Sequence, residues 1–346
     1  MHTTTTLGRP LAALLVPLLA GTAAVAGDGT GLHFQHHDWE LACDNTGSCR
    51  AAGYQAGEDG LAVSVLLERQ AGPAQPVRGR LRLGDVGGTP GVGEATLRID
   101  GRSLGGLNFG GDVTAPLSDA QVAALLAALR RDSRITVDAG EAGEWRLSDR
   151  GASAVLLKMD EVQGRLGTRG ALVRRGDADE AQVPPARPLP EIRVPPLAAT
   201  RGEDAAVARD PVLLAALRAA TDADACERLH GDEAVQLQVE RLDERHLLVS
   251  TACWLAAYNS GDGYWIVSAQ PPYAPRLVTA DASFHADGII RAYQKGRGLG
   301  DCAWRMEWAW DGRDFVPAFE ATTGLCRLVA DGGAWELPTR VSRILR

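Results

Sequence analysis

A regular alternation of large apolar residues near the C-terminus constrains the fold of this chain more than any other feature. The alternating residues are Trp304, Met306, Trp308 and Trp310. A period of two places all four on one face of a β-strand. The dipeptide Asp311-Gly312 follows, and it is typical of a two-residue type I′ turn because Asp and Gly tolerate a positive φ. The sequence therefore predicts a β-hairpin with the cross-strand pairs Trp308–Phe315, Met306–Pro317 and Trp304–Phe319.

The aromatic face of this hairpin has two interpretations. A sheet face of this kind usually packs on a hydrophobic core. The alternative is a platform on which a sugar or a peptide stacks, which makes Trp304 and Trp308 candidate ligand-binding residues. Pro317 lacks an N–H, which indicates that its strand lies at a sheet edge or directs that position outward.

The first 26 residues are typical of a secretory signal peptide. Arg9 supplies a positive start, Leu11–Ala20 an apolar core and Ala24–Ala26 a cleavage site before Gly27. The mature chain contains no apolar stretch of membrane length, so we expect no integral membrane segment and a location in the bacterial periplasm. The formal net charge of −8 argues against nucleic acid as a partner.

Six cysteines fit an oxidising compartment, where disulfides persist. If the two halves of the chain fold separately, Cys43 pairs with Cys49, and the remaining four cysteines allow three pairings. Among these we favour the pairs Cys226–Cys253 and Cys302–Cys326. The chain contains no C-x-x-C motif and no cysteine spacing typical of zinc, so we predict neither thiol redox catalysis, nor a metal, nor a cofactor.

The fold class predicted is mainly β with some α (α+β), in two domains. A β-sandwich-like domain with one helix is expected over residues 27–175, and an α+β domain over 204–346. The segment 176–203 contains six prolines, a density that predicts a semi-rigid linker. The second domain is expected to begin with helices and to continue as an antiparallel meander.

Local patterns place the elements within these domains. Ser118, followed by Gln121, predicts a capped helix over 118–131, and Asp210-Pro211 begins a second helix over 210–220. A short helix is expected at Cys226. The strands expected in the first domain cover 61–69, 77–83, 95–99, 134–138, 144–147 and 152–158, after a hairpin closed by Cys43 and Cys49. In the second domain, turns are expected near Asp243, within 259–263 and at Asp287-Gly288.

The chain carries three stretches that are informative together, namely Phe34–Tyr54, Trp145–Thr168 and Gly296–Trp310. They resemble a family of Gram-negative envelope proteins catalogued only as a domain of unknown function, over nearly the whole mature chain. The first domain, with an Asp-Trp-x-x-x-Cys start, a late helix and a Gly-x-x-Ala-hydrophobic segment at Gly151–Leu156, is also similar to the invasion-associated locus B family. That similarity implies a secreted β-sandwich-like module. Neither resemblance implies a catalytic residue.

Two clusters of polar residues are candidate ligand sites. His33, His36 and His37, beside Asp38, offer nitrogen ligands for a transition metal. We interpret them as polar residues at a strand edge and predict no metal site. The Gly-rich loop 296–301 contains Arg297 and Asp301. Arg297 could bind a carboxylate or a phosphate, or it could pair with Asp301 and hold the loop beside Cys302.

No catalytic set is evident from the sequence. The chain contains no G-x-S-x-G motif, and the most conspicuous acid pair, Asp160-Glu161, is interpreted as a solvated turn. We predict a secreted periplasmic protein that acts as a non-enzymatic binding or structural module of the cell envelope, with a protein, peptide or glycan as its partner. The alternatives are a hydrolase acting on envelope polymers and an inhibitor of a hydrolase that inserts the loop 296–301. A deep pocket with convergent polar groups would favour an enzyme, and a flat or grooved apolar patch would favour a binding protein.

Overall fold

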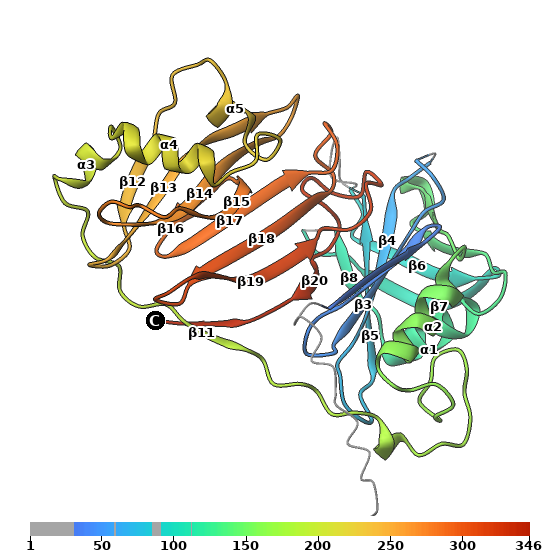
Figure 1. Ribbon diagram of the computed structural model, residues 1–346. Helices are drawn as coiled ribbons and strands as arrows, with labels where there is room; N and C mark the ends of the chain where they lie inside the picture. The colour runs from blue at the N-terminus through green and yellow to red at the C-terminus, as the bar shows by residue number, and fades with distance from the viewer. Residues whose placement is uncertain (1–30, 59, 85–90, 112) are drawn as a thin grey trace, which may run out of the picture.

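The computed structural model describes residues 31–58, 60–84, 91–111 and 113–346, and the predicted signal peptide lies outside them. The protein is mostly β, with several antiparallel sheets and few helices (Figure 1). Within the described residues, no helix combines the length and the apolar character needed to cross a membrane.

The N-terminal half contains two antiparallel sheets with a hydrophobic core between them. The six-stranded sheet contains, in order, β1 (Leu32–His36), β2 (Trp39–Cys43), β3 (Cys49–Tyr54), β4 (Val63–Arg69), β5 (Val77–Leu83) and β8 (Thr114–Pro116). The smaller sheet has the order β10 (Glu144–Leu147), β9 (Ile135–Asp138), β6 (Glu94–Ile99) and β7 (Arg102–Asn108). The segments 61–69, 77–83, 95–99, 134–138 and 144–147 were each expected to contain a strand, and the structure confirms a β-strand in each of them.

Two helices pack on this core, where the sequence predicted one. Helix α1 (Asp119–Ala128) begins with the predicted capping box of Ser118 and Gln121. Helix α2 (Ala152–Val162) occupies the segment 152–158 that was predicted as a strand, so that prediction is wrong. Its buried residues are Ala152, Val155, Leu156, Met159 and Asp160. This spacing of three and four is the period of a helix, and the run of small and apolar residues concealed it.

A glycine fixes the start of α2. Gly151 has φ 97°, and a Cβ atom at this position would lie 1.9 Å from the carbonyl oxygen of His36. The close approach docks the helix on the turn between β1 and β2, where the backbone N–H of Asp38 donates to the carbonyl of Arg150. A residue with a side chain could not make this contact.

The proline-rich segment between the halves runs extended along the molecule (Figure 1). It contains the short strand β11 (Glu191–Arg193), which pairs in parallel with β21 (Arg343–Leu345) near the C-terminus. The one-turn helix Glu180–Gln182 precedes it. The division of the chain into independently folding domains stays a prediction.

The C-terminal half is layered (Figure 1). Helices α3 (Asp204–Val207), α4 (Pro211–Ala219) and α5 (Glu227–His230) come first. The helix-covered sheet contains β12 (Gln238–Arg241), β13 (His246–Leu255), β14 (Ser260–Ser268) and β15 (Arg276–Ala282). The aromatic sheet contains β16 (Phe284–Ala286), β17 (Ile289–Lys295), β18 (Ala303–Trp310), β19 (Phe315–Thr322) and β20 (Leu337–Arg340). One core lies between the helices and the first of these sheets, and a second core lies between the two sheets.

The aromatic hairpin forms, but its predicted register is wrong. The turn contains four residues, 311–314, because the Asp311 carboxylate accepts hydrogen bonds from the backbone of Arg313 and Asp314, each at 2.8 Å. Trp310 therefore faces Phe315. Trp308 faces Pro317 in the same register. A β-bulge between Glu307 and Trp308 then displaces the pairing, so that Met306 faces Glu320 and Trp304 faces Thr322. The shared face of the tryptophans nevertheless packs in the core between the sheets.

The two-residue Asp-Gly turn occurs at 287–288, as predicted. Asp287 and Gly288 have φ values of 53° and 75°, and Ala286 pairs with Ile289. Positive φ at both central residues is the signature of the type I′ turn. At 311–312 only Gly312 has a positive φ, of 96°, because Asp311 is used as a side-chain cap.

The six cysteines form the three favoured pairs, Cys43–Cys49, Cys226–Cys253 and Cys302–Cys326. The first closes the hairpin of β2 and β3. The second ties α5 to β13, and the third joins the residues that precede β18 and follow β19.

The outer face of the six-stranded sheet is covered by the C-terminal segment 323–341. The apolar residues in this contact are Ala42, Ala52, Tyr54 and Leu66 from the sheet, with Val329, Ala334, Trp335 and Leu337 opposite. Polar contacts accompany them, including 2.7 Å from Trp335 Nε1 to Ser64 Oγ and 2.7 Å from Gln55 Nε2 to the Arg327 carbonyl. Because both faces of the sheet are covered, β2 is buried at every position.

A buried hydrogen-bonded chain lies within this contact. The Tyr54 hydroxyl donates to Glu40 Oε1 at 2.8 Å and accepts from the backbone N–H of Leu325 at 3.1 Å. Gly324 has φ 99°, and a Cβ atom there would lie 2.2 Å from the Tyr54 hydroxyl. The backbone can reach the tyrosine only because this residue is a glycine.

The substitution Gly324→Ala is expected to destabilise the protein much more than Gly57→Ala. Both glycines have a positive φ, but a Cβ atom at Gly57 meets nothing within 4 Å. The Gly57 variant should lose about 1 kcal/mol, the cost of the backbone conformation alone. The Gly324 variant should lose about 3 kcal/mol or more, since the added methyl group also displaces Tyr54. Urea denaturation measures both values, and equal losses would contradict the proposed role of this contact.

Candidate functional site

The predicted ligand residues Arg297 and Asp301 bind each other. Arg297 Nε lies 2.7 Å from Asp301 Oδ1, and Nη2 lies 2.7 Å from Oδ2. Arg297 also pairs with Glu58 of the N-terminal half, and Asp301 Oδ2 accepts from the backbone N–H of Leu328 at 2.7 Å. Burial alone would raise the pKa of Asp301, but Arg297 and the Leu328 N–H hold it below its usual value. The Arg297 guanidinium therefore stabilises the loop 296–301 and the contact between the two halves of the chain.

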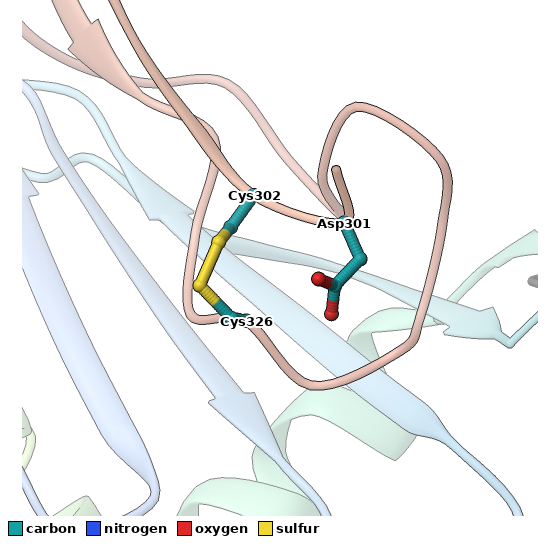
Figure 2. Close-up of side chains that lie close together, drawn as sticks. All are labelled: Asp301, Cys302 and Cys326. Carbon is teal, nitrogen blue, oxygen red and sulfur yellow. A yellow bond between two sulfur atoms is a disulfide. The ribbon is translucent and has the colours of Figure 1, made fainter. Parts of the chain in front are cut away.

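Asp301 lies beside the disulfide of Cys302 and Cys326, as Figure 2 shows. Ligand-type atoms of these three residues lie within 4.8 Å of one another, and no other such group of three was found among the described residues. The two sulfur atoms are bonded to each other, so neither is a thiolate that could bind a metal ion. The donor set does not fit a metal centre.

The two candidate tryptophans serve mainly in the core. Trp308 is buried between the sheets, and Trp304 is partly buried at the edge of the same cluster. Trp308, with Phe315 and Pro317, also lines a hollow of about 280 Å³ between β15 and the hairpin of β18 and β19. The structure therefore does not gather Arg297, Asp301, Trp304 and Trp308 into one cavity among those described here, and their ligand-binding role stays a prediction.

The histidine cluster near the start of the described chain separates into two environments. His33 Nε2 lies 3.1 Å from the buried carboxylate of Glu40, whose other oxygen binds Tyr54. His36 and His37 are exposed at the turn. Asp38 accepts from the Ser148 hydroxyl at 2.7 Å and from Arg327 at 2.9 Å. Asp38 therefore contributes to the contact between the two halves through Arg327, whereas the ion pair of His33 lies within the N-terminal half.

The acid pair Asp160-Glu161 does not form a solvated turn, so that interpretation is wrong for Asp160. Asp160 is fully buried on α2, and its Oδ2 accepts from the backbone N–H groups of Leu172 at 2.7 Å and Val173 at 3.0 Å. Burial raises the pKa of Asp160. Glu161 is exposed and pairs with Lys158. Asp160 faces the core and Glu161 faces solvent, so they do not work together as a pair of catalytic acids.

The structure instead presents a cavity that the sequence analysis did not identify. The apolar groove, of about 630 Å³, lies between α4, the ends of β13 and β14, and the loop before β15. Its lining residues are Val212, Ala216, Ala219, Ala220, His246, Ile266, Val267, Ser268, Pro272, Tyr273, Ala274, Pro275 and Arg276. Its wall on α4 consists mostly of alanines, which leave the space open. Val212 lies at its edge and is 55% exposed.

An Asp–His pair stands at the rim of the apolar groove. His246 Nδ1 lies 2.9 Å from Asp243 Oδ2, and the Asp243 carboxylate also accepts from the backbone of Arg245 and His246. Burial alone would raise the pKa of Asp243, but these hydrogen bonds hold it below its usual value. Ser268 faces His246 across the strands, yet among the described residues no hydrogen bond joins its hydroxyl to the imidazole. The three residues therefore lack the contact that defines a catalytic triad.

The groove could have been anticipated only in part from the sequence. The alanines of α4 and the prolines at 271, 272 and 275 are visible as composition. The hollow itself results from how the loop folds beside the helix, which no local pattern specifies.

Comparison with known proteins identifies one matching family and a relative. A family model described as "Protein of unknown function (DUF1176)" matches residues 33–342. The chain is similar to "Uncharacterized protein YpfG" from Escherichia coli (strain K12), with 26% identity over 311 residues, covering 80% of this chain and 84% of that protein. No solved structure matches the chain. These matches do not bear on the similarity to the invasion-associated locus B family, which stays a prediction.

Removal of the Arg297 side chain is expected to reduce stability. In Arg297→Ala the buried carboxylate of Asp301 loses its bidentate partner, at a cost of about 2–3 kcal/mol in the free energy of unfolding. Arg305→Ala is the matched control, because Arg305 pairs with Glu336 in a half-exposed geometry and should cost under about 1 kcal/mol. Urea denaturation with the disulfides intact measures both. A loss for Arg297→Ala no larger than the control would show that the pair does not hold the loop.

The pair of His33 and Glu40 predicts a pH dependence of stability. The hydrogen bond with Glu40 raises the pKa of His33 above its unfolded value of about 6.5, while burial opposes this rise. The stability that the pair contributes is therefore fully present below about pH 6.5 and is lost as the pH rises through the folded-state pKa. We expect His33→Gln to destabilise the protein at about pH 5.5 and to have less effect at about pH 9.

The exposed His36 provides the control for this measurement. It lies on the same strand and makes no ion pair among the described residues. The free energy of unfolding of His36→Gln should follow that of the unmodified protein at both pH values. A His33→Gln effect of the same size at both pH values would show that protonation of His33 is not involved.

Proposed function

Because the chain belongs to the DUF1176 family, whose function is unknown, we propose a function from its own geometry. The protein is a secreted periplasmic protein that acts as a non-enzymatic binding module of the cell envelope. The observation that carries this proposal is the apolar groove beside α4.

The shape and lining of the groove suit binding more than catalysis. The groove is open to solvent, and its walls are mainly alanine, valine, isoleucine and proline side chains. An exposed apolar hollow of this kind is typical of an interaction site. The polar groups at its rim, Asp243, His246 and Arg276, are already paired, since Arg276 binds Asp314.

The proposed occupant is an apolar peptide segment of an envelope protein. A small-molecule site usually encloses most of its ligand, whereas this groove leaves one side uncovered. Individual apolar side chains of a polypeptide can enter such a hollow while their backbone remains in solvent, and the exposed Val212 extends the contact surface at the edge.

The proposed location is supported by the three disulfides. Disulfides form and persist in oxidising compartments such as the periplasm and the outside of the cell. The signal-like pattern of residues 1–26 agrees with export.

The alternative of a hydrolase for envelope polymers has less support. Asp160, the more buried member of the conspicuous acid pair, is used to hold the backbone of Leu172 and Val173. In the described part of the chain, no hydroxyl group forms a hydrogen bond with the imidazole of the Asp–His pair at the groove. A hydrolase needs both an acid–base set and a site for the reacting bond within reach of it.

The proposed location predicts that the mature chain is recovered from the periplasmic fraction of cells.

Filling the groove is expected to weaken binding. The purified protein should bind the neutral apolar dye N-phenyl-1-naphthylamine. The arginine side chain introduced by Ala216→Arg should occupy the groove and weaken dye binding at least about tenfold. Fluorescence titration of the dye measures the affinity, and apolar peptides that compete with the dye would identify the proposed occupant.

The matched control is Ala215→Arg. Ala215 is an exposed neighbour on α4 that does not line the groove, so this variant carries the same added charge and should bind the dye as the unmodified protein does. Equal binding by all three proteins would show that the groove is not the site. Recovery of the chain from the cytoplasm alone would contradict the proposed location.

A further inference from the structure

Farther along β13 and β14 lies a second hollow of different chemistry. The polar cavity, of about 480 Å³, is lined by Arg228, Glu233, Ala234, Val235, Gln236, Gln238, Ser250, Thr251, Ala252, Asp262 and Tyr264. None of these residues lines the apolar groove. The polar cavity is therefore a second site, and its lining is separate from that of the proposed peptide site.

The register of three strands builds the wall of this cavity. Gln238 of β12 pairs with Ser250 of β13, and Ser250 pairs with Tyr264 of β14. The next row on the same face contains Asp262, two residues before Tyr264, opposite Ala252. Ser250 and Tyr264 are only 8% and 6% exposed, so polar side chains that are held in place by the sheet form the wall.

Asp262 carries a negative charge that the protein does not balance. Among the described residues its carboxylate has no ion pair and no hydrogen bond, and burial raises its pKa. The one cationic side chain in the lining, Arg228, binds Glu233 at 3.1 Å. A carboxylate taken partly out of water without a partner is costly, and it serves no turn or cap here because it lies within a strand.

The neighbouring Tyr264 stays uncharged and can both donate and accept hydrogen bonds. Burial raises its pKa to about 12, and the charges of Asp262 and Glu240 add to this effect. The cavity thus combines one unpaired carboxylate with amide and hydroxyl groups, which is a set suited to a ligand that is cationic at one point and polar elsewhere.

We propose that the polar cavity binds a small organic cation whose primary ammonium group pairs with Asp262 and whose hydroxyl groups bond to Gln238, Ser250 and Tyr264, as in an amino sugar. An ammonium group brings up to three donors and supplies the charge that Asp262 lacks. Pairing in a partly buried site yields a charge-assisted hydrogen bond, which is stronger than a neutral one.

Calorimetric titration with matched ligands tests this proposal. Glucosamine should bind the unmodified protein, whereas N-acetylglucosamine and glucose, which lack the charge, should bind at least about tenfold more weakly. Ethanolamine and putrescine test whether a simple amine suffices. The failure of all three amines to bind, even with millimolar dissociation constants, would overturn the proposal.

Variants locate the binding. Asp262→Asn keeps the shape of the side chain and removes its charge, so glucosamine affinity should fall at least about tenfold. Asp232→Asn is the control, because Asp232 is an exposed acid in the adjoining loop that does not line the cavity. It changes the net charge equally and should leave affinity unchanged.

A second variant tests the polar wall separately from the charge of Asp262. Gln238→Leu removes a polar group of the wall while leaving Asp262 in place, and it should weaken glucosamine binding. Melting curves of each variant confirm that it is folded. Unchanged affinity in a folded Asp262→Asn variant, or equal binding of N-acetylglucosamine and glucosamine, would show that no ammonium site exists here. Loss of dye binding at the apolar groove would not affect either result.

Discussion

The Tyr54 hydroxyl joins the two halves of the chain, and the arrangement of the molecule depends on the contact around it. It binds Glu40 within the six-stranded sheet and the backbone of Leu325 in the C-terminal segment. Such buried polar groups are costly unless every partner is in place. The glycine at 324 allows the approach, and the apolar residues of the segment 323–341 then cover the outer face of the sheet.

Several other features hold the same contact in place. The disulfide of Cys302 and Cys326 fixes the start of the segment, and the pair of Arg297 and Asp301 anchors it through the Leu328 backbone. Farther along, the proline-rich linker pairs with β21. The loop 296–301, which contains the predicted ligand residues Arg297 and Asp301, is therefore part of the contact between the two halves. Arg297 and Asp301, which suggested binding from the sequence, pair with each other at this contact, and Gly296 packs closely against the disulfide.

This contact between the halves leaves the sheet of β12, β13, β14 and β15 available for two cavities. The apolar groove and the polar cavity share β13 and β14 but use different stretches of them. The groove exists because alanines on α4 leave space beside a folded loop. The cavity exists because β12, β13 and β14 align polar residues in register. Two binding chemistries can thus be carried by one sheet without sharing a side chain.

The sequence by itself determined the local elements. The capping box at Ser118, the Asp-Gly turn at 287–288 and the alternation from Trp304 to Trp310 all depend on neighbouring residues, and all three were predicted. The hairpin register and the helix α2 were not predicted. The Asp311 side chain caps the turn and lengthens it, and in α2 a run of small and apolar residues concealed the helical spacing of the buried positions. The pairing of Arg297 with Asp301, four residues away, was one of the two interpretations that the sequence allowed. The burial of Glu40 and the contact of Arg297 with Glu58 were decided only by the tertiary structure. Both depend on segments far apart in the chain, and one sequence does not record which distant surfaces meet.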